Sequence, residues 1–304
     1  MVVAKRPDSG QTLTHENVKD GSMQRLLRWI GIAVGGVAAL GLIAYIAVYV
    51  LSERVMQHAY ATPTIALSIP TDAASIAEGR RLATTRGCFA GCHGKQAEGQ
   101  VMFDEPMIAR FIAPNLTAAV RKYSDADLAA IIRSGVRPDG RAMIVMPSES
   151  FVGLTADDLG RIIAFLKSLP AAEGPGPSVA LGPIGRLGLV IGKFKTPAQS
   201  IVETVPLPEA KNEQAAAGRY LAQTTCVQCH GTSLHGDSNP DFTSPNLQIV
   251  AAYSPEAFAL LMRTGTALGD RKLGVMRTAA RNNLSQLTDA EIAALYSYLH
   301  VTTF

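Results

Sequence analysis

Cysteine and histidine occur together in two short runs of this chain, and these runs carry its clearest chemical signal. One run, C-V-Q-C-H at residues 226–230, has the C-x-x-C-H spacing that is typical of covalent haem attachment. The other, C-F-A-G-C-H at residues 88–93, has one residue more between its cysteines. Two thiols so placed can bond the two vinyl groups of a haem, and the histidine that follows can reach the iron. Since the chain has 4 cysteines in total, none remains for a structural disulfide or a nucleophile.

The longer run at residues 88–93 fits haem attachment better than a zinc site or a disulfide. A zinc site would need further nitrogen or sulfur ligands at a suitable spacing, and residues 72–170 contain no other cysteine or histidine. A disulfide would leave His93 unexplained. We therefore expect haem attachment through both thiols, with attachment through a single thioether as the alternative. We expect the extra residue to bulge outwards at Gly91, since glycine tolerates unusual dihedral angles.

Residues 72–170 and 209–304, called here the first repeat and the second repeat, are two copies of one unit. The blocks G-R-R-L-A-T-T-R-G-C and G-R-Y-L-A-Q-T-T-C lead into the cysteine runs, and A-P-N-L-T and S-P-N-L-Q follow them. Two further pairs of blocks, beginning with Y-S and with L-T, come later in the same order. Apolar residues at helical spacing, preceded by serine or threonine caps, predict helices there. Each repeat is thus expected to be a small helical domain.

A second axial ligand for each iron must come from elsewhere in its repeat. His93 is the only histidine of the first repeat, so a pair of histidines would need a residue from outside it. A methionine thioether is the next candidate, and it raises the reduction potential. In the first repeat we favour Met146, at a Met-Pro step before the last helix, over Met143. In the second repeat we favour Met276, expected in the loop before the last helix, over Met262 within a predicted helix.

In these residues the chain resembles tandem class I c-type cytochromes, that is, a membrane-anchored dihaem cytochrome c. The resemblance covers the two repeats and rests on C-x-x-C-H-G, the P-N-L block, the Met-Pro loop and the L-T-x-x-[DE]-[LI] helix. It implies an all-α fold of two cytochrome c-like domains with two covalently bound haem c groups. It also implies that the carbonyls of Pro114 and Pro245 accept a hydrogen bond from each ligand histidine, which fixes the imidazole ring. The implied site residues are Cys88, Cys92, Cys226 and Cys229 for attachment and His93, Met146, His230 and Met276 as axial ligands.

One uncharged segment near the N-terminus predicts a transmembrane anchor. Residues 29–51 form an apolar run of 23 residues, enough to cross a bilayer core as a helix. Basic residues are more numerous before this run than after it, which places residues 1–28 in the cytoplasm and both repeats on the periplasmic side of the inner membrane. A cleaved signal peptide is the alternative, because residues 59–61 resemble a cleavage site, although secretory apolar regions are shorter, about 7–15 residues.

Residues 171–208 join the two repeats and are predicted to be a linker. Its ends are rich in proline and glycine, which break helices. Its middle, residues 181–194, is apolar and rich in glycine. This composition fits either a linker packed against the domains or a patch that lies on the membrane or on a partner.

The proposed ligand sets bear on function, because iron with an imidazole and a thioether has no open coordination position. The sequence therefore favours single-electron transfer from a membrane or periplasmic donor to an acceptor such as a terminal oxidase. The chain would act as a tethered carrier or as the cytochrome subunit of a respiratory or dehydrogenase complex, with no catalytic residue of its own. A dihaem enzyme of the peroxidase or thiosulfate dehydrogenase type is the alternative, with a labile Met276. The net charge of +3 gives no indication of a nucleic-acid partner.

Overall fold

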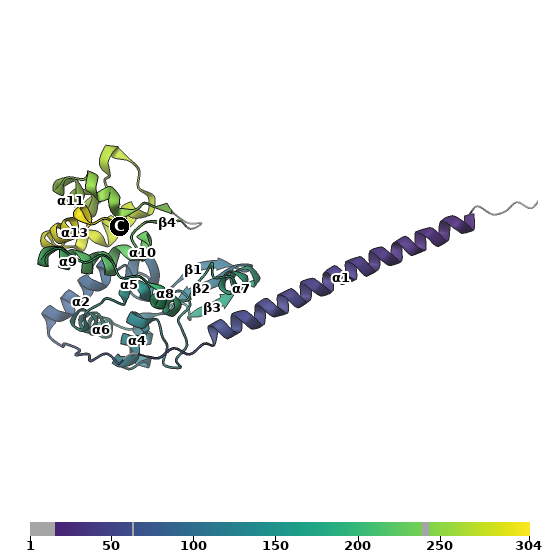
Figure 1. The fold of residues 1–304 in the computed structure, drawn as a ribbon. Helices are drawn as coiled ribbons and strands as arrows, with labels where there is room; N and C mark the ends of the chain where they lie inside the picture. The colour runs from purple at the N-terminus through teal and green to yellow at the C-terminus, as the bar shows by residue number, and fades with distance from the viewer. Residues whose placement is uncertain (1–15, 63, 239–242) are drawn as a thin grey trace, which may run out of the picture. The chain divides into compact units, whose positions relative to one another are not determined.

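The computed structural model describes residues 16–62, 64–238 and 243–304, and the chain divides into two compact units after Leu51. Residues 1–15, part of the expected cytoplasmic tail, lie outside the described residues. The N-terminal unit consists of most of α1 (Glu16–Met56), an uninterrupted helix (Figure 1). Within α1, residues 21–56 are apolar and long enough to cross a membrane, by length and composition.

The second compact unit holds both repeats and is mostly helical, as the sequence predicts (Figure 1). In the first repeat the elements are α2 (Ala73–Thr85), the π-helix η1 (Cys88–His93), β1 (Gln100–Glu105), β2 (Ala109–Ala113), α3 (Leu116–Lys122), α4 (Asp125–Ser134), α5 (Ser148–Phe151) and α6 (Ala156–Ser168). In the second repeat they are α9 (Glu213–Leu221), the π-helix η2 (Ala222–Cys226), α10 (Val227–His230), β4 (Asp237–Ser238), β5 (Thr243–Ser244), the 3₁₀ helices η3 (Leu247–Ala252), η4 (Leu268–Asp270) and η5 (Leu284–Gln286), α11 (Pro255–Thr264), α12 (Gly274–Asn282) and α13 (Asp289–Val301).

In each repeat the first helix packs across the last one, α2 on α6 and α9 on α13. The crossing point is a glycine in both copies. A Cβ atom built on Gly79 would lie 1.9 Å from the carbonyl oxygen of Arg161, and one built on Gly218 would lie 2.0 Å from that of Ala294. No other residue type permits so close an approach of two backbones. This crossing fixes the helix that leads into each cysteine run.

The predicted helix starts are present. Ser124 and Thr288 form capping boxes with Asp127 and Glu291, which begin α4 and α13. The Thr155 hydroxyl accepts a hydrogen bond from the third backbone amide of α6. Buried apolar side chains behind these caps form one core in each repeat. Local sequence signals therefore determine where the main helices begin.

The structure contains a small sheet that the predicted all-α fold did not include. One strand of this sheet comes from the linker. The antiparallel order is β1-β2-β3, and β3 (Ser178–Leu181) comes from the segment between the repeats. The same segment forms α7 (Pro183–Val190) and α8 (Pro197–Glu203). Leu189 and Ala198 are buried there, while several apolar neighbours remain exposed. The linker is therefore both packed on the first repeat and a source of exposed apolar surface.

Candidate haem-attachment sites

The first cysteine run is wound as a π-helix, and this accommodates its extra residue. Helix η1 covers Cys88–His93, and π-helical winding admits more residues per turn than an α-helix. Gly87, and not Gly91, takes the left-handed conformation, with φ at 76°. The side chain of Phe89 packs edge-on against Phe165 of α6, with the ring centroids 5.8 Å apart. Gly91 is exposed, as an outward bulge requires, but the extra residue is accommodated by π-helical winding and not by an unusual dihedral angle at Gly91.

The second cysteine run continues a helix without a break. Helices α9, η2 and α10 follow one another directly, and the π-helical stretch here precedes the run. Cys226 ends η2, and Cys229 and His230 lie on α10. The two repeats thus present the same residue types on differently wound helices.

Each histidine that follows a cysteine run is oriented by a proline carbonyl. The Nδ1 atoms of His93 and His230 lie 2.9 Å from the carbonyl oxygens of Pro114 and Pro245. Because a carbonyl only accepts, Nδ1 carries the proton and Nε2 keeps its lone pair for a metal. Burial lowers the pKa of both histidines against the opposing effect of the proline hydrogen bond, so the imidazoles are neutral at pH 7. Neutral imidazole is the form that binds iron.

The loop after each histidine has the same backbone shape in both repeats. Ala97 and Leu234, both fully buried, take the left-handed conformation with φ at 62° and 60°. The backbone amides of Gly99 and Gly236 donate to the carbonyls of the two histidines at 2.7 and 2.9 Å. The matched positions with positive φ are Gly94 and Gly231, Ala97 and Leu234, and Gly99 and Gly236.

This loop shape brings the proline carbonyl to the imidazole. A Cβ atom on Gly99 would lie 2.6 Å from the carbonyl oxygen of Ala113, and one on Gly236 would lie 2.5 Å from that of Ser244. Glycine is therefore required at both positions. These two glycines were not predicted from the sequence, although the shared spacing G-x-x-x-x-G after each histidine was a signal that could have found them.

The four thiols fit haem attachment better than metal or nucleophile chemistry. All four are free, and burial raises the pKa of Cys88 and of Cys226 to about 12. Thiols of this kind stay protonated at neutral pH and are poor nucleophiles. In the part of the chain that the structure describes, no group of three or more His, Cys, Asp and Glu side chains could hold a metal ion. Each repeat thus offers the donor set of a covalently attached haem, namely two thiols and an imidazole with a free Nε2.

The candidate methionine ligands differ in their surroundings. Met146 is partly buried and packs against the core of the first repeat, whereas Met143 is not among the residues packed there. Met262 is 4% exposed and belongs to the core of α11, as the sequence suggests. Met276 packs against the core of the second repeat, but it lies on α12 and not in a loop. The expected loop is helical because residues 274–282 have ordinary helix formers and no proline.

The two cysteine runs face each other where the repeats meet. Gly87 directly precedes the first run, and Gln228 lies within the second. A Cβ atom on Gly87 would lie 3.4 Å from the side-chain nitrogen of Asn283 and 3.6 Å from the side-chain oxygen of Gln228. The two attachment runs are therefore part of the contact between the repeats.

A buried arginine stands at this contact. Arg86 is 3% exposed and lies two residues before Cys88. Its Nη2 lies 3.5 Å from the Asp158 carboxylate and 3.4 Å from the Tyr220 hydroxyl, and its guanidinium faces the tyrosine ring at 5.8 Å. The hydroxyl of Tyr220 donates to Asp158 at 2.5 Å. One residue of the second repeat thus completes a polar cluster in the first.

An ion pair joins the two repeats. Arg81 on α2 donates twice to the carboxylate of Glu291 on α13, at 2.7 and 2.9 Å, and it also pairs with Glu78. Burial of Glu291 favours a higher pKa, but hydrogen bonds from Arg81 and the Thr288 amide outweigh this effect and leave the pKa below its ordinary value. The planar guanidinium is well suited to such a two-point contact.

Acidification is expected to weaken the contact between the repeats. Because the pKa of Glu291 is lowered in the folded protein, its stabilising effect is complete above the unfolded value, near 4.5, and is lost as the pH falls through the folded pKa. We expect a loss of about 1 kcal/mol from this partly exposed pair. Denaturant unfolding measured from pH 7 to pH 3.5 tests this. In Glu291→Gln, which keeps the helix cap, this component of the pH dependence should be absent; an unchanged profile would contradict the assignment.

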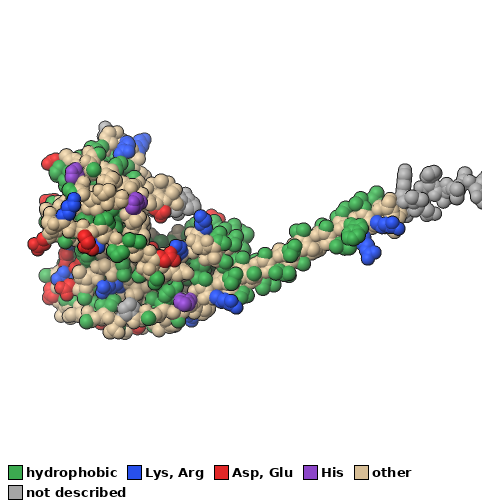
Figure 2. All heavy atoms as spheres, viewed as in Figure 1, with side chains coloured by type: hydrophobic (Ala, Val, Ile, Leu, Met, Phe, Trp, Pro, Cys, Tyr) green, Lys and Arg blue, Asp and Glu red, His purple; other side chains and the backbone are tan. Residues whose placement is uncertain are grey.

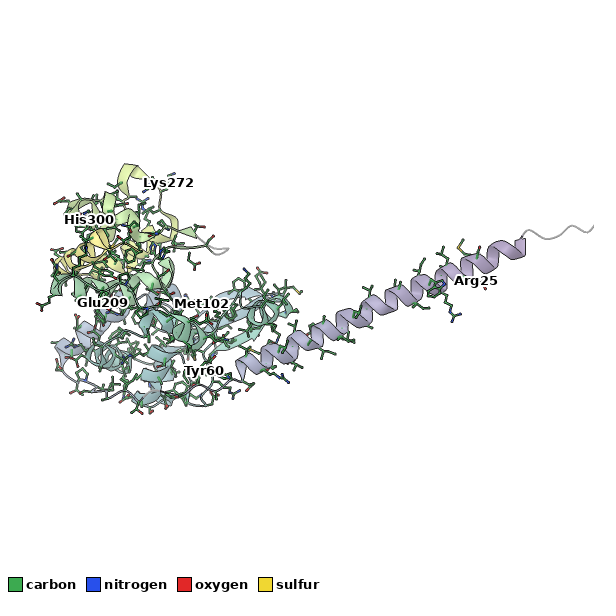
Figure 3. The ribbon with its side chains drawn as sticks, viewed as in Figure 1. Arg25, Tyr60, Met102, Glu209, Lys272 and His300 are labelled. Atoms are coloured by element: carbon green, nitrogen blue, oxygen red, sulfur yellow. The ribbon has the colours of Figure 1, made fainter. Side chains whose placement is uncertain are left out.

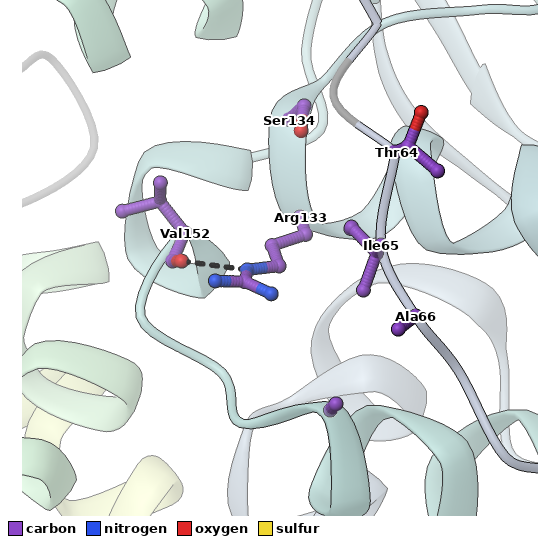
Figure 4. A pocket seen from close by; sticks show the side chains of 7 residues that line it. Thr64, Ile65, Ala66, Arg133, Ser134 and Val152 are labelled. Atoms are coloured by element: carbon purple, nitrogen blue, oxygen red, sulfur yellow. Dashed lines mark hydrogen bonds between the residues drawn. The ribbon is translucent and has the colours of Figure 1, made fainter.

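A surface cleft of about 370 Å³ lies apart from the cysteine runs (Figure 4). Thr64, Ile65 and Ala66 line one side of it, and Arg133 lies opposite. The Nε of Arg133 donates to the carbonyl of Val152 at 2.9 Å. None of the predicted ligand residues lines this cleft, so it offers no support for the enzymatic alternative.

Comparison with known proteins supports the repeats and their cofactor class. A family model described as Cytochrome c matches residues 76–170 and 215–303. The chain is also similar to the fructose dehydrogenase cytochrome subunit of Gluconobacter japonicus, at 24% identity over 253 residues. The alignment covers 74% of this chain and 52% of that protein, so the chain spans about half the length of the curated relative it matches.

Proposed function

The chain belongs to the cytochrome c family, and we propose that it is the dihaem electron-transfer subunit of a membrane-bound dehydrogenase complex. A c-type cytochrome carries covalently bound haem c, which supplies reversible one-electron oxidation and reduction at its iron. The observation that carries the proposal is the duplicated histidine geometry: in both repeats a proline carbonyl holds Nδ1 and leaves Nε2 for the iron. The similarity to a dehydrogenase's cytochrome subunit favours a stable subunit over a freely diffusing carrier.

The chain would hold one haem in each repeat, with both axial positions filled. Partial burial against a core supports Met146 and Met276 as the thioether ligands. A closed coordination shell favours electron transfer over chemistry at the iron. The proposed haem-binding residues are Cys88, Cys92, His93 and Met146 in the first repeat and Cys226, Cys229, His230 and Met276 in the second, with Pro114 and Pro245 orienting the histidines.

The contact between the repeats supports electron passage within one chain. Gly87, next to the first attachment run, lies against Gln228 within the second, so the two runs lie at the same contact. The remaining surfaces would serve an electron donor, proposed to be the dehydrogenase, and a membrane-associated acceptor. We further propose that α1 anchors the chain in the inner membrane with both repeats on the periplasmic side.

The haem content of the purified full-length chain tests the core of this proposal. Intact mass spectrometry should show two haem masses added to the polypeptide. The double variant Cys226→Ala/Cys229→Ala should retain one, and so should Cys88→Ala/Cys92→Ala. A single haem in the unaltered chain would contradict the proposal and would place the defect at the longer run. Purification from native membranes should then yield a dehydrogenase in constant ratio to this chain.

A further inference from the structure

A stripe of large apolar side chains on α7 is exposed to solvent. Ile184, Leu187 and Ile191 are 53%, 43% and 59% exposed. Their spacing of three and four residues places them on one side of the helix. Leu189, on the opposite side, is 4% exposed and packed into the unit. The stripe therefore faces outwards, because the opposite side of α7 packs into the unit.

The turn between β1 and β2 extends this apolar surface. Met107 and Ile108 are 58% and 43% exposed. A Cβ atom on Gly185 would lie 2.1 Å from the carbonyl oxygen of Ile108, so α7 rests directly on the turn. Figure 2 shows apolar side chains gathered over this region. Met102, on the strand β1 that leads into the turn, is 41% exposed (Figure 3). We call Met107, Ile108, Ile184, Leu187 and Ile191 the apolar face.

The helix α7, which carries most of the apolar face, contacts the residues that follow the apolar run of α1. Nη1 of Arg186, on α7, lies 2.9 Å from the Glu53 carboxylate and 2.8 Å from the Ser52 hydroxyl. Ser52 is fully buried, and it directly follows Leu51, the last residue of the uncharged run. If the run spans the hydrocarbon core, these two residues lie at the bilayer boundary. The contact with Arg186 then holds α7 at the same depth.

The charge around the apolar face suits an anionic lipid surface. Residues 178–195 contain three basic residues and no acidic one; Arg186 is paired with Glu53 and Lys195 with Glu203, which leaves Lys193 for lipid headgroups. Lys193 is exposed at the end of α7. Helices that lie in a membrane interface combine an apolar side with basic residues, which interact with lipid headgroups.

We propose that the apolar face lies in the interfacial layer of the bilayer. The unit that contains both repeats would then contact the lipid through this face, in addition to being anchored by α1. This inference rests on the proposed membrane anchoring by α1. A protein partner could cover the same apolar area, but the tether of α7 to the first two residues after the membrane run favours lipid. Contact of this face with the lipid would restrict the orientations that the haem-attachment sites adopt toward membrane-bound partners.

Fluorescence quenching in bilayers of the full-length chain tests the proposal. Cysteine is introduced at Leu187 and labelled with an environment-sensitive dye, and each sample is reconstituted into nanodiscs of anionic lipid with or without brominated acyl chains. The ratio of the two intensities for the same site removes any quenching by haem. Leu260, 50% exposed on α11 of the second repeat, is the matched control. Leu40, within the apolar run of α1, reports on anchoring.

We expect brominated lipid to quench the dye at residue 187 at least twofold and the dye at residue 260 hardly at all. Equal ratios at residues 187 and 260, with residue 40 quenched, would overturn the proposal and favour a protein partner for this face. Absence of quenching at residue 40 would overturn it by removing the anchor on which it rests. The haem content of the same samples, read from their absorption spectra, separates these outcomes from a failure of the proposed electron-transfer function.

Discussion

Leucine in place of Met146 is expected to lower the reduction potential of the first repeat's haem by on the order of 0.1 V, within the ~0.8 V range that axial ligands span. Thioether ligation raises the potential, and leucine has no donor atom. The two side chains have similar volumes, so core packing should change by less than about 1.5 kcal/mol. Redox titration of the full-length protein measures the potential, and carbon monoxide binding to the reduced protein reports the opened position.

Met143→Leu is the matched control, because Met143 lies in the same loop but is not packed against the core. It should leave both the potential and carbon monoxide binding unchanged. The reverse pattern, in which Met143→Leu opens the iron and Met146→Leu does not, would exchange the two assignments. The same comparison applies to Met276→Leu and Met262→Leu in the second repeat. There the buried Met262 should affect stability only.

Features of the site that depend on residues close together in the sequence could be predicted from the sequence. The cysteine runs, the repeat and the caps at Ser124, Thr155 and Thr288 are local patterns, and each appears in the structure where the sequence places it. The proline carbonyls of Pro114 and Pro245 came from the family resemblance, and both lie at hydrogen-bond distance from their histidines. Local patterns together with the family resemblance therefore predicted the surroundings of the two histidines.

Features that depend on contacts between distant segments were not predictable from such patterns. Strand β3 pairs with β2 although the two are separated by most of the first repeat, and nothing in the composition of β3 names its partner. The packing of η1 involves a contact of Phe89 with Phe165 on α6, 76 positions further along the chain. In the sequence, nothing distinguishes Arg86 from an ordinary exposed charged residue at a helix end. Its burial requires Tyr220 from the other repeat, which a single sequence does not indicate.

Leucine in place of Arg86 is expected to weaken the contact between the two repeats and to destabilise the protein by about 2 kcal/mol. The substitution removes the only cation that the described contacts place between Asp158 and Tyr220. The carboxylate, 16% exposed, then keeps its ion pair with Arg161 at 3.4 Å but loses its buried partner. Denaturant unfolding measures the stability. Electron equilibration between the repeats after rapid partial reduction should slow, because the two attachment runs meet beside Arg86.

Arg80→Leu is the matched control, since Arg80 is exposed on the same helix, and it should change the stability by less than about 0.5 kcal/mol. Arg86→Lys should fall between the two, because lysine keeps the charge but lacks the planar fork that serves two acceptors. If Arg86→Leu lowers the stability but leaves equilibration as fast as in the unaltered protein, the contact stabilises the fold without positioning the sites. If both change together, the residue that joins the repeats also sets the route of the electron between them.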